Sequence, residues 1–203
     1  MPNKEQEKSI RKNNTEIDFE PITHTYSVKG RRLPSVSEIM RPLTDAYYST
    51  IPHAVLDNAS NRGTRVHEAI EMYDVLGVEA NDKEIKPYLL GYKMAKNVEK
   101  FYSIQNEIML TNGEYCGTLD IIGQLGKDLV IIDLKATSKI NYELIEVQLA
   151  GYLELAKANG YQIEKTYVCH VKPSSYKFVE IDPNVELWEQ LKQDWKNDEP
   201  NSI

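Results

Sequence analysis

The chain has 203 residues, of which 41% are hydrophobic and 27% are charged, as is ordinary for a soluble globular protein. This length suits one well-packed domain rather than two. No apolar run approaches a membrane span, and the first residues lack the apolar core of a signal peptide, so we expect a cytoplasmic protein with no membrane partner.

The net charge of −7 argues against a broad surface for nucleic-acid backbones, because non-specific affinity for them comes mainly from Lys and Arg. It does not exclude an enzyme that acts on nucleic acid, since clustered carboxylates are what hold divalent metals. The two cysteines, Cys116 and Cys169, have no CxxC spacing. We therefore expect neither a zinc site nor an iron–sulfur cluster.

The N-terminal region begins with residues 1–18, which are polar and without periodicity, and we expect them to be a flexible lead-in. From His24 the pattern predicts a short hairpin, then a short helix that is capped by Ser35 or Ser37 and stopped by Pro42. We interpret this region as a structural cap over one edge of the core. The alternative is that its three arginines contact a phosphate backbone: Arg31, Arg32 and Arg41.

The remaining chain alternates between helical and strand patterns. Apolar residues at helical spacing predict helices over residues 58–76, 84–103, 141–159 and 184–196. Strands are predicted over residues 107–110, 115–122, 129–135, 165–171 and 176–181. The strand after the third helix is expected to return beside the central strand by a right-handed crossover. The predicted fold class is α/β, with a mixed central sheet flanked by helices in one domain over 19–198 and a loose tail over 199–203.

The stretch GTLDIIGQLGKDLVIIDLK, residues 117–135, predicts two strands joined by a turn. Asp133 and Lys135 share a face of the second strand, while Leu134 points into the core. Opposed pairing of the strands brings Asp120 alongside them. Two carboxylates and an ammonium at the end of an apolar strand are costly unless they are used. The alternative is a plain ion pair between Asp133 and Lys135.

Four short motifs stand in a fixed order along the chain. They are GTRVH ending at His67, GTLD ending at Asp120, DLK over 133–135, and QLAGY over 148–152. Each alone has an ordinary explanation: a lone histidine on a helix is usually structural, and a Gln–Tyr pair four residues apart packs on one helix face. Together, on a helix, two strands and a helix, they predict a divalent-metal site that acts on a phosphate.

This pattern resembles the PD-(D/E)XK nuclease superfamily, and within it the RecB-like exonuclease branch. The segment LPSVSEIM before the GTRVH helix looks most similar to small phage-encoded members. Leu119 stands where the superfamily name has proline, in keeping with the G-x-x-D form of the RecB-like branch. The resemblance implies a restriction-endonuclease-like core, and the missing cluster cysteines disfavour the iron–sulfur subgroups.

The resemblance also implies roles for individual residues. One or two ions of Mg²⁺ or Mn²⁺ are expected on His67, Asp120, Asp133 and the carbonyl of Leu134. The expected catalytic set is Asp120, Asp133, Lys135, Gln148 and Tyr152, with Lys135 orienting the attacking water and the last two positioning Lys135 and a DNA phosphate. The expected substrate-binding residues are Thr137, Ser138 and Tyr152. Three further carboxylates either reach the metals or are simply exposed: Glu68, Glu71 and Glu107.

The function implied by the resemblance is a divalent-metal-dependent DNA exonuclease that hydrolyses phosphodiester bonds in phage DNA recombination, replication or repair, in the host cytoplasm. Its substrate would be single-stranded DNA or duplex ends. No Walker motif is present, so unwinding would need a partner, and a recombinase, a single-strand binding protein or a helicase is expected. The alternative is a catalytically idle protein of the same fold that binds a recombination or host-defence partner.

Overall fold

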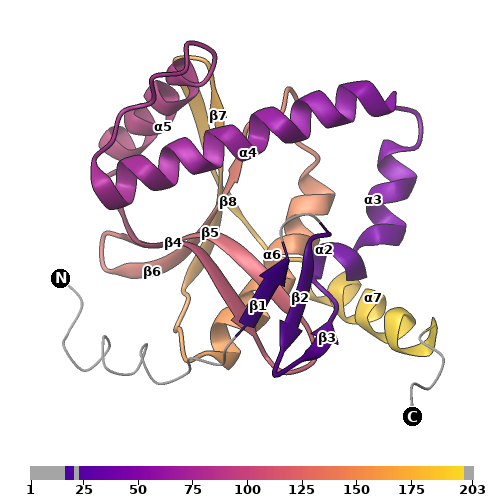
Figure 1. Ribbon diagram of the computed structural model, residues 1–203. Helices are drawn as coiled ribbons and strands as arrows, with labels where there is room; N and C mark the ends of the chain where they lie inside the picture. Colours follow the sequence, from indigo (N-terminus) through magenta and orange to yellow (C-terminus); the bar gives the residue numbers. More distant parts are fainter. Residues whose placement is uncertain (1–16, 21–22, 199–203) are drawn as a thin grey trace.

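The computed structural model describes residues 17–20 and 23–198, which form a small sheet, a larger sheet and a set of helices (Figure 1). The predicted lead-in and loose tail fall largely on residues 1–16 and 199–203, outside the described residues. The predicted lead-in also includes Ile17 and Asp18, but these two residues begin a strand. That part of the prediction is wrong because these two residues pair with a strand that follows them.

The small sheet contains β1 (Ile17–Glu20), β2 (Thr25–Val28) and β3 (Arg31–Leu33), all antiparallel. The predicted hairpin is therefore confirmed, and β1 adds a strand to it. Ser35 caps α2 (Val36–Ile39) in a capping box with Glu38. The prediction that Pro42 stops a helix is wrong, because Pro42 lies in the first turn of α3 (Arg41–Tyr48). Proline is tolerated there, since an N–H in the first turn has no hydrogen-bond partner within the helix.

The central sheet has the strand order β4-β5-β6-β7-β8. Its strands are β4 (Phe101–Thr111), β5 (Cys116–Leu125), β6 (Asp128–Lys135), β7 (Lys165–Lys172) and β8 (Ser175–Ile181). The first three are antiparallel, β7 is parallel to β6, and β8 is antiparallel to β7. Helix α6 (Tyr142–Ala158) connects β6 to β7. The mixed sheet flanked by helices confirms the predicted fold class, consistent with a restriction-endonuclease-like core.

Helices cover both faces of this sheet (Figure 1). Side chains of α4 (His53–Leu76) and α5 (Lys86–Glu99) pack on one face, and those of α2, α6 and α7 (Val185–Asp198) on the other. Neighbours along β6 alternate between the two cores: Ile131 joins the α6 side, whereas Ile132 and Leu134 join the α4 side. Asp133 therefore belongs to the face covered by α6.

Two predicted helix boundaries are wrong. The helix predicted from residue 58 begins five residues earlier, at His53, directly after Pro52. The helix predicted to run to residue 103 ends at Glu99, because Lys100 adopts the left-handed conformation (φ 59°). Phe101 then starts β4 by pairing with Leu125 of β5, so β4 is also longer than predicted. Pairing between distant segments overrode the local helical pattern.

Across the described ranges, 17–20 and 23–198, we find no helix with both the length and the apolar character that crossing a membrane requires.

The packing of α5 on the turn between β7 and β8 gives a test of the fold. A Cβ added at Gly91 would lie 2.4 Å from the carbonyl oxygen of Ser175 and 2.6 Å from that of Lys172. We expect Gly91→Ala to lower the free energy of unfolding by about 1–3 kcal/mol, because the backbone must shift. The measurement is urea denaturation of both proteins.

The matched control is Gly63→Ala in the middle of α4, where an added Cβ meets nothing within 4 Å. This change should raise stability by about 0.5–1 kcal/mol, since alanine loses less entropy in a helix. Equal effects of the two substitutions would contradict the packing described here.

Candidate active site

The site begins where β5 and β6 stop pairing. Their ladder ends with Ile121 opposite Ile132. Beyond it, the backbone N–H of Leu134 donates to the side-chain Oδ2 of Asp120 (2.6 Å). The expectation that Asp120 lies alongside the DLK segment is therefore confirmed. The side chain of Asp120 thus accepts the hydrogen bond that a backbone carbonyl would accept within the ladder. Polar side chains can therefore gather at these two strand ends.

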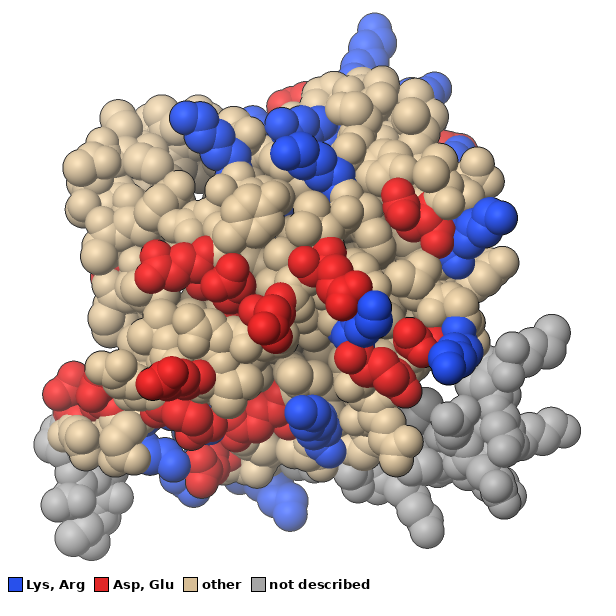
Figure 2. Space-filling model, turned by 180° about the vertical axis from the view of Figure 1, so that it is seen from behind, with Lys and Arg blue, Asp and Glu red and all other residues tan. Residues whose placement is uncertain are grey.

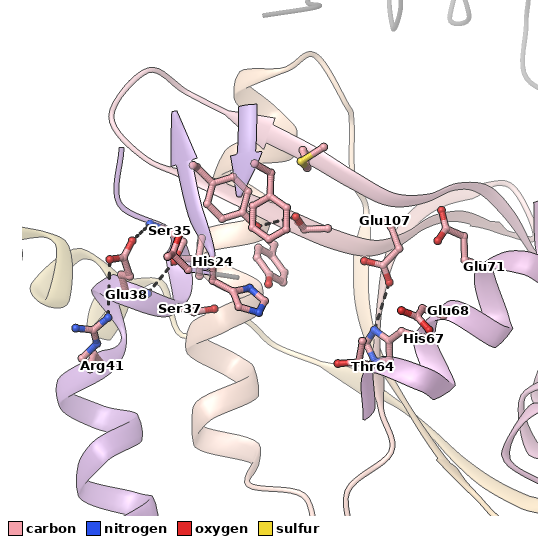
Figure 3. Close-up of a pocket in the computed structure, with 18 residues that line it drawn as sticks. His24, Ser35, Ser37, Glu38, Arg41, Thr64, His67, Glu68, Glu71 and Glu107 are labelled. Carbon is pink, nitrogen blue, oxygen red and sulfur yellow. Dashed lines mark hydrogen bonds and ion pairs between the residues drawn. The ribbon is translucent and has the colours of Figure 1, made fainter. Parts of the chain in front are cut away.

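His67 reaches this point from α4, which is anchored to the sheet by the buried Val66 and Ile70. The Nε2 atom of His67 lies 3.2 Å from the carbonyl oxygen of Leu134. Its Nδ1 atom lies 3.3 Å from Glu107 Oε1 and 3.5 Å from an Asp120 oxygen. Figure 3 shows His67 and Glu107 pointing toward each other from the helix and from β4.

Glu107, left open by the sequence, is part of this group. His67, Glu107 and Asp120 each offer one ligand atom, and these atoms lie within 4.8 Å of one another. The backbone of Glu107 adopts the left-handed conformation (φ 47°), which is unfavourable for residues other than glycine. Such strain persists where the surroundings enforce it, and often marks functional sites. No local sequence pattern signals this conformation.

A second chain of contacts runs from the end of β6 to α6. Asp133 is 2% exposed, and Lys135 donates to its Oδ1 (2.9 Å) and to Gln148 Oε1 (3.0 Å). Gln148 in turn donates from its Nε2 to the hydroxyl of Tyr152 (3.0 Å). The DLK and QLAGY motifs thus meet, with Lys135 held between Asp133 and Gln148.

Burial and neighbouring charges set the protonation of these groups. Burial raises the pKa of Asp133 to about 6, although Lys135 opposes the shift. Burial also raises the pKa of Asp120. For His67 burial lowers the pKa, but Asp120 and Glu107 outweigh it and raise the pKa to about 9. Burial likewise lowers the pKa of Lys135, and Asp133 and Asp120 outweigh it in raising that pKa. The positive charges of His67 and Lys135 thus compensate the buried carboxylates of Asp120 and Asp133.

These residues fit a divalent cation. Oδ2 of Asp133 is buried and accepts no hydrogen bond from the described residues, although Lys135 Nζ lies 2.7 Å away in a poorly directed ionic contact. Carboxylate oxygens with an imidazole are a ligand set for such ions. Binding would displace the proton of His67, since a ligating histidine is neutral. Asp133 itself lies outside the three-residue group, held by Lys135.

The two residues after β6 that are predicted to donate hydrogen bonds to a phosphate make fewer contacts with the other site residues. Thr137 shares a cavity of about 210 Å³ with Lys135 and Gln148, but its hydroxyl donates to the carbonyl of Lys139 (2.8 Å). Ser138 is exposed. Of the N-terminal arginines, Arg32 and Arg41 form ion pairs with Glu38, the residue that completes the cap of α2.

Sequence reasoning missed Asp74, which links the helices to β4. Its side chain is 1% exposed and forms an ion pair with Lys96 of α5. It also accepts hydrogen bonds from Tyr92 (2.5 Å), Ser103 (2.5 Å) and Asn106 (3.1 Å). Asp74 lies two helical turns after His67, and Asn106 directly precedes Glu107. This carboxylate therefore holds both sides of the His67–Glu107 contact. An aspartate near a helix end gives no such signal.

The charge on the face seen in Figure 2 is uneven. Acidic side chains cross the middle of this face, while Lys and Arg lie mainly toward its edges. Such a surface repels DNA phosphates, because association with the backbone depends on clustered positive charge. This face is therefore unsuited to a broad nucleic-acid contact, as the net charge of −7 indicated.

Comparison with known proteins gives distant likenesses. No protein-family model and no curated protein matches the chain. The crystal structure of SSO0001 is similar at 16% identity and a TM-score of 0.44, covering 87% of this chain and 80% of that chain. A phage related exonuclease from Haemophilus somnus is similar at 13% identity and a TM-score of 0.43, covering 79% of this chain and 89% of that chain. With TM-scores below 0.5, neither likeness bears on the chemistry of the site.

The role of Asp74 can be tested by stability. We expect Asp74→Ala to lower the free energy of unfolding by about 3–5 kcal/mol, because it leaves Lys96 without its counter-charge and removes the acceptor shared by Tyr92, Ser103 and Asn106. Chemical denaturation measures this loss. Glu79→Ala is the control, because Glu79 forms an exposed pair with Lys93 and should cost less than about 1 kcal/mol. Similar small losses for both variants would show that Asp74 is not an anchor.

Proposed function

We propose that this chain is a divalent-metal-dependent DNA exonuclease whose nuclease domain comprises the fold from β1 to α7. The observation that carries the proposal is the convergence of two groups at the ends of β5 and β6. One group is the ligand set around His67 and Asp120, and the other is the ion pair of Asp133 with Lys135. A buried carboxylate held by an ammonium at 2.7 Å, beside a set of His, Glu and Asp ligand atoms, favours cation-assisted chemistry on an anion.

In this proposal Mg²⁺ or Mn²⁺ is held by His67, Asp120, Glu107 and the carbonyl of Leu134, with Asp133 beside it. Such an ion, once bound, lowers the pKa of water and stabilises negative charge on a phosphate. Lys135 supplies positive charge where the phosphate gains negative charge, and its hydrogen bond to Gln148 fixes its direction (3.0 Å). Tyr152 holds Gln148 in turn.

The role in phage recombination, replication or repair, the action on single strands or duplex ends, and a recombinase, single-strand binding protein or helicase as partner belong to the same proposal. Their support is the sequence resemblance. Thr137 and Ser138 are proposed to donate to the backbone of the substrate, Thr137 by exchanging its hydrogen bond to the carbonyl of Lys139. Thr137 adjoins Lys135 in one cavity, which supports its part of this role.

The test is degradation of end-labelled linear DNA by the purified protein in Mg²⁺ or Mn²⁺. We expect Asp120→Asn and Lys135→Ala each to lower the rate at least about 100-fold, because the first removes a charged metal ligand and the second removes positive charge beside the phosphate. The matched controls are Asp128 at the opposite end of β6 and Lys127 in the turn before it: Asp128→Asn and Lys127→Ala should leave the rate unchanged. A closed circular substrate distinguishes an exonuclease, which leaves it intact, from an endonuclease.

Full activity in Asp120→Asn and Lys135→Ala would refute the site assignment. A folded wild-type protein that degrades no DNA with either metal would refute the nuclease itself. In that case the alternative of an idle binding protein that acts on a recombination or host-defence partner takes its place.

A further inference from the structure

A cavity of about 630 Å³ adjoins the candidate metal ligands, between α4 and the small sheet. Cavities of this volume commonly bind small organic molecules in proteins. His67 and Glu107 form part of its wall, so the cavity and the ligand cluster share residues. Figure 3 shows His67, Glu107 and Glu68 on one side and His24 across from them. Whatever binds at the ligand cluster has the cavity as its immediate neighbour.

The wall across from α4 is aromatic and held in place. Phe19 lies beside Tyr26, with ring centroids 4.7 Å apart, and beside His24 at 5.5 Å. Phe19 and Tyr26 are paired across β1 and β2, and the Tyr26 hydroxyl lies 2.7 Å from Thr118 Oγ1 in a hydrogen bond to the central sheet. His24 is exposed and adopts the left-handed conformation (φ 49°). Because the planes of Phe19 and His24 are 66° apart, a flat group can stack on the exposed ring of His24 while Phe19 supports that ring edge-on.

The charges in the cavity select what can stack there. Glu68 and Glu71 line it, and neither has a hydrogen-bonding or ionic partner within the described part of the chain. Glu38, by contrast, is neutralised by Arg32 and Arg41. Free carboxylates repel a phosphate but accept hydrogen bonds from amino groups, as acidic side chains do from the N4 amino group of cytosine. The cavity therefore suits an uncharged aromatic ring that carries amino groups.

We propose that this cavity binds the nucleobase next to the scissile phosphate, stacked on the exposed ring of His24, which Phe19 supports edge-on, with its amino groups toward Glu68 and Glu71. The inference rests on the proposed function, because the metal ligands must receive the adjoining phosphate. A base that is paired within a duplex cannot enter a pocket. The substrate class is therefore DNA with an unpaired nucleotide at the cleavage point, such as a single strand or a frayed end.

The first experiment measures stacking without requiring cleavage. A short single strand with 2-aminopurine at either terminus is titrated with protein in Ca²⁺, and quenching of its fluorescence reports stacking. His24→Asn removes the imidazole and keeps a residue that tolerates a positive φ, and Phe19→Leu keeps the apolar packing. His24→Asn should weaken the quenched complex about tenfold, the scale of one base–aromatic stack, and Phe19→Leu should weaken it less, because Phe19 only supports the imidazole. Thermal unfolding checks that both variants remain folded.

Two control substitutions lie outside the cavity lining. His53→Asn changes an exposed histidine at the start of α4, and Tyr102→Leu changes an aromatic side chain of β4 that is 67% exposed. Both should bind and quench as the wild type does. Quenching that His24→Asn and Phe19→Leu leave unchanged would overturn the proposal, as would absence of quenching in the wild type.

The second experiment separates this inference from the nuclease proposal. Terminal nucleotides are cut in Mn²⁺ from strands whose last base is present or replaced by an abasic site. The wild type should cut the intact end about tenfold faster, and His24→Asn should cut both ends equally. Cleavage indifferent to the missing base would overturn the nucleobase site and leave the nuclease intact. Quenching without any cleavage would uphold the nucleobase site and refute the nuclease.

Discussion

The site depends on the end of pairing between β5 and β6. Past Ile121 and Ile132 the ladder stops, and the N–H of Leu134 turns to the carboxylate of Asp120 (2.6 Å). A buried backbone donor must be satisfied, so this hydrogen bond fixes the orientation of the carboxylate. The carbonyl of Leu134 then faces His67 from the opposite side (3.2 Å). One backbone unit thereby connects the strand ends to the helix that covers them.

Buried charge is the second constraint on the structure. Asp133 is almost fully buried, and its carboxylate is tolerated because Lys135 lies beside it. Desolvation nonetheless raises the pKa of Asp133 to about 6, which shows that the compensation is incomplete. Burying a carboxylate such as that of Asp133 lowers the free energy of unfolding, and groups with shifted pKa values of this kind cluster at functional sites. The same reasoning applies to Glu107, whose backbone conformation is unfavourable for its side chain.

Much of this arrangement is predictable from local pattern. The alternation along VIIDLK places Asp133 and Lys135 on one face, and the helical spacing of Gln148 and Tyr152 places both on one side of α6. The mixed sheet follows from a helix between two apolar strands. By contrast, Phe101 was assigned to a helix, and only its pairing with Leu125 reveals a strand.

Contacts between distant segments account for what the pattern could not reveal. The sequence around Asp74 does not distinguish it from other residues of α4. Its role depends on hydrogen bonds from Ser103 and Asn106, which lie 29 and 32 residues later in the chain. Glu107 reaches His67 because its backbone leaves the ordinary strand conformation, which no residue type in the segment demands. The pairing of β1 with β2 is local, but the polar segment before the hairpin has no strand periodicity, so the contact of Phe19 with Tyr26 is also missing from the prediction.

The ends of β5 and β6 are proposed to hold a divalent cation against His67. Anomalous diffraction from crystals grown with Mn²⁺ would locate this ion. We predict a Mn²⁺ peak within about 2.5 Å of an Asp120 oxygen, a His67 ring nitrogen and the carbonyl oxygen of Leu134. No peak at this position under saturating Mn²⁺, or a peak only elsewhere on the protein, would contradict the account.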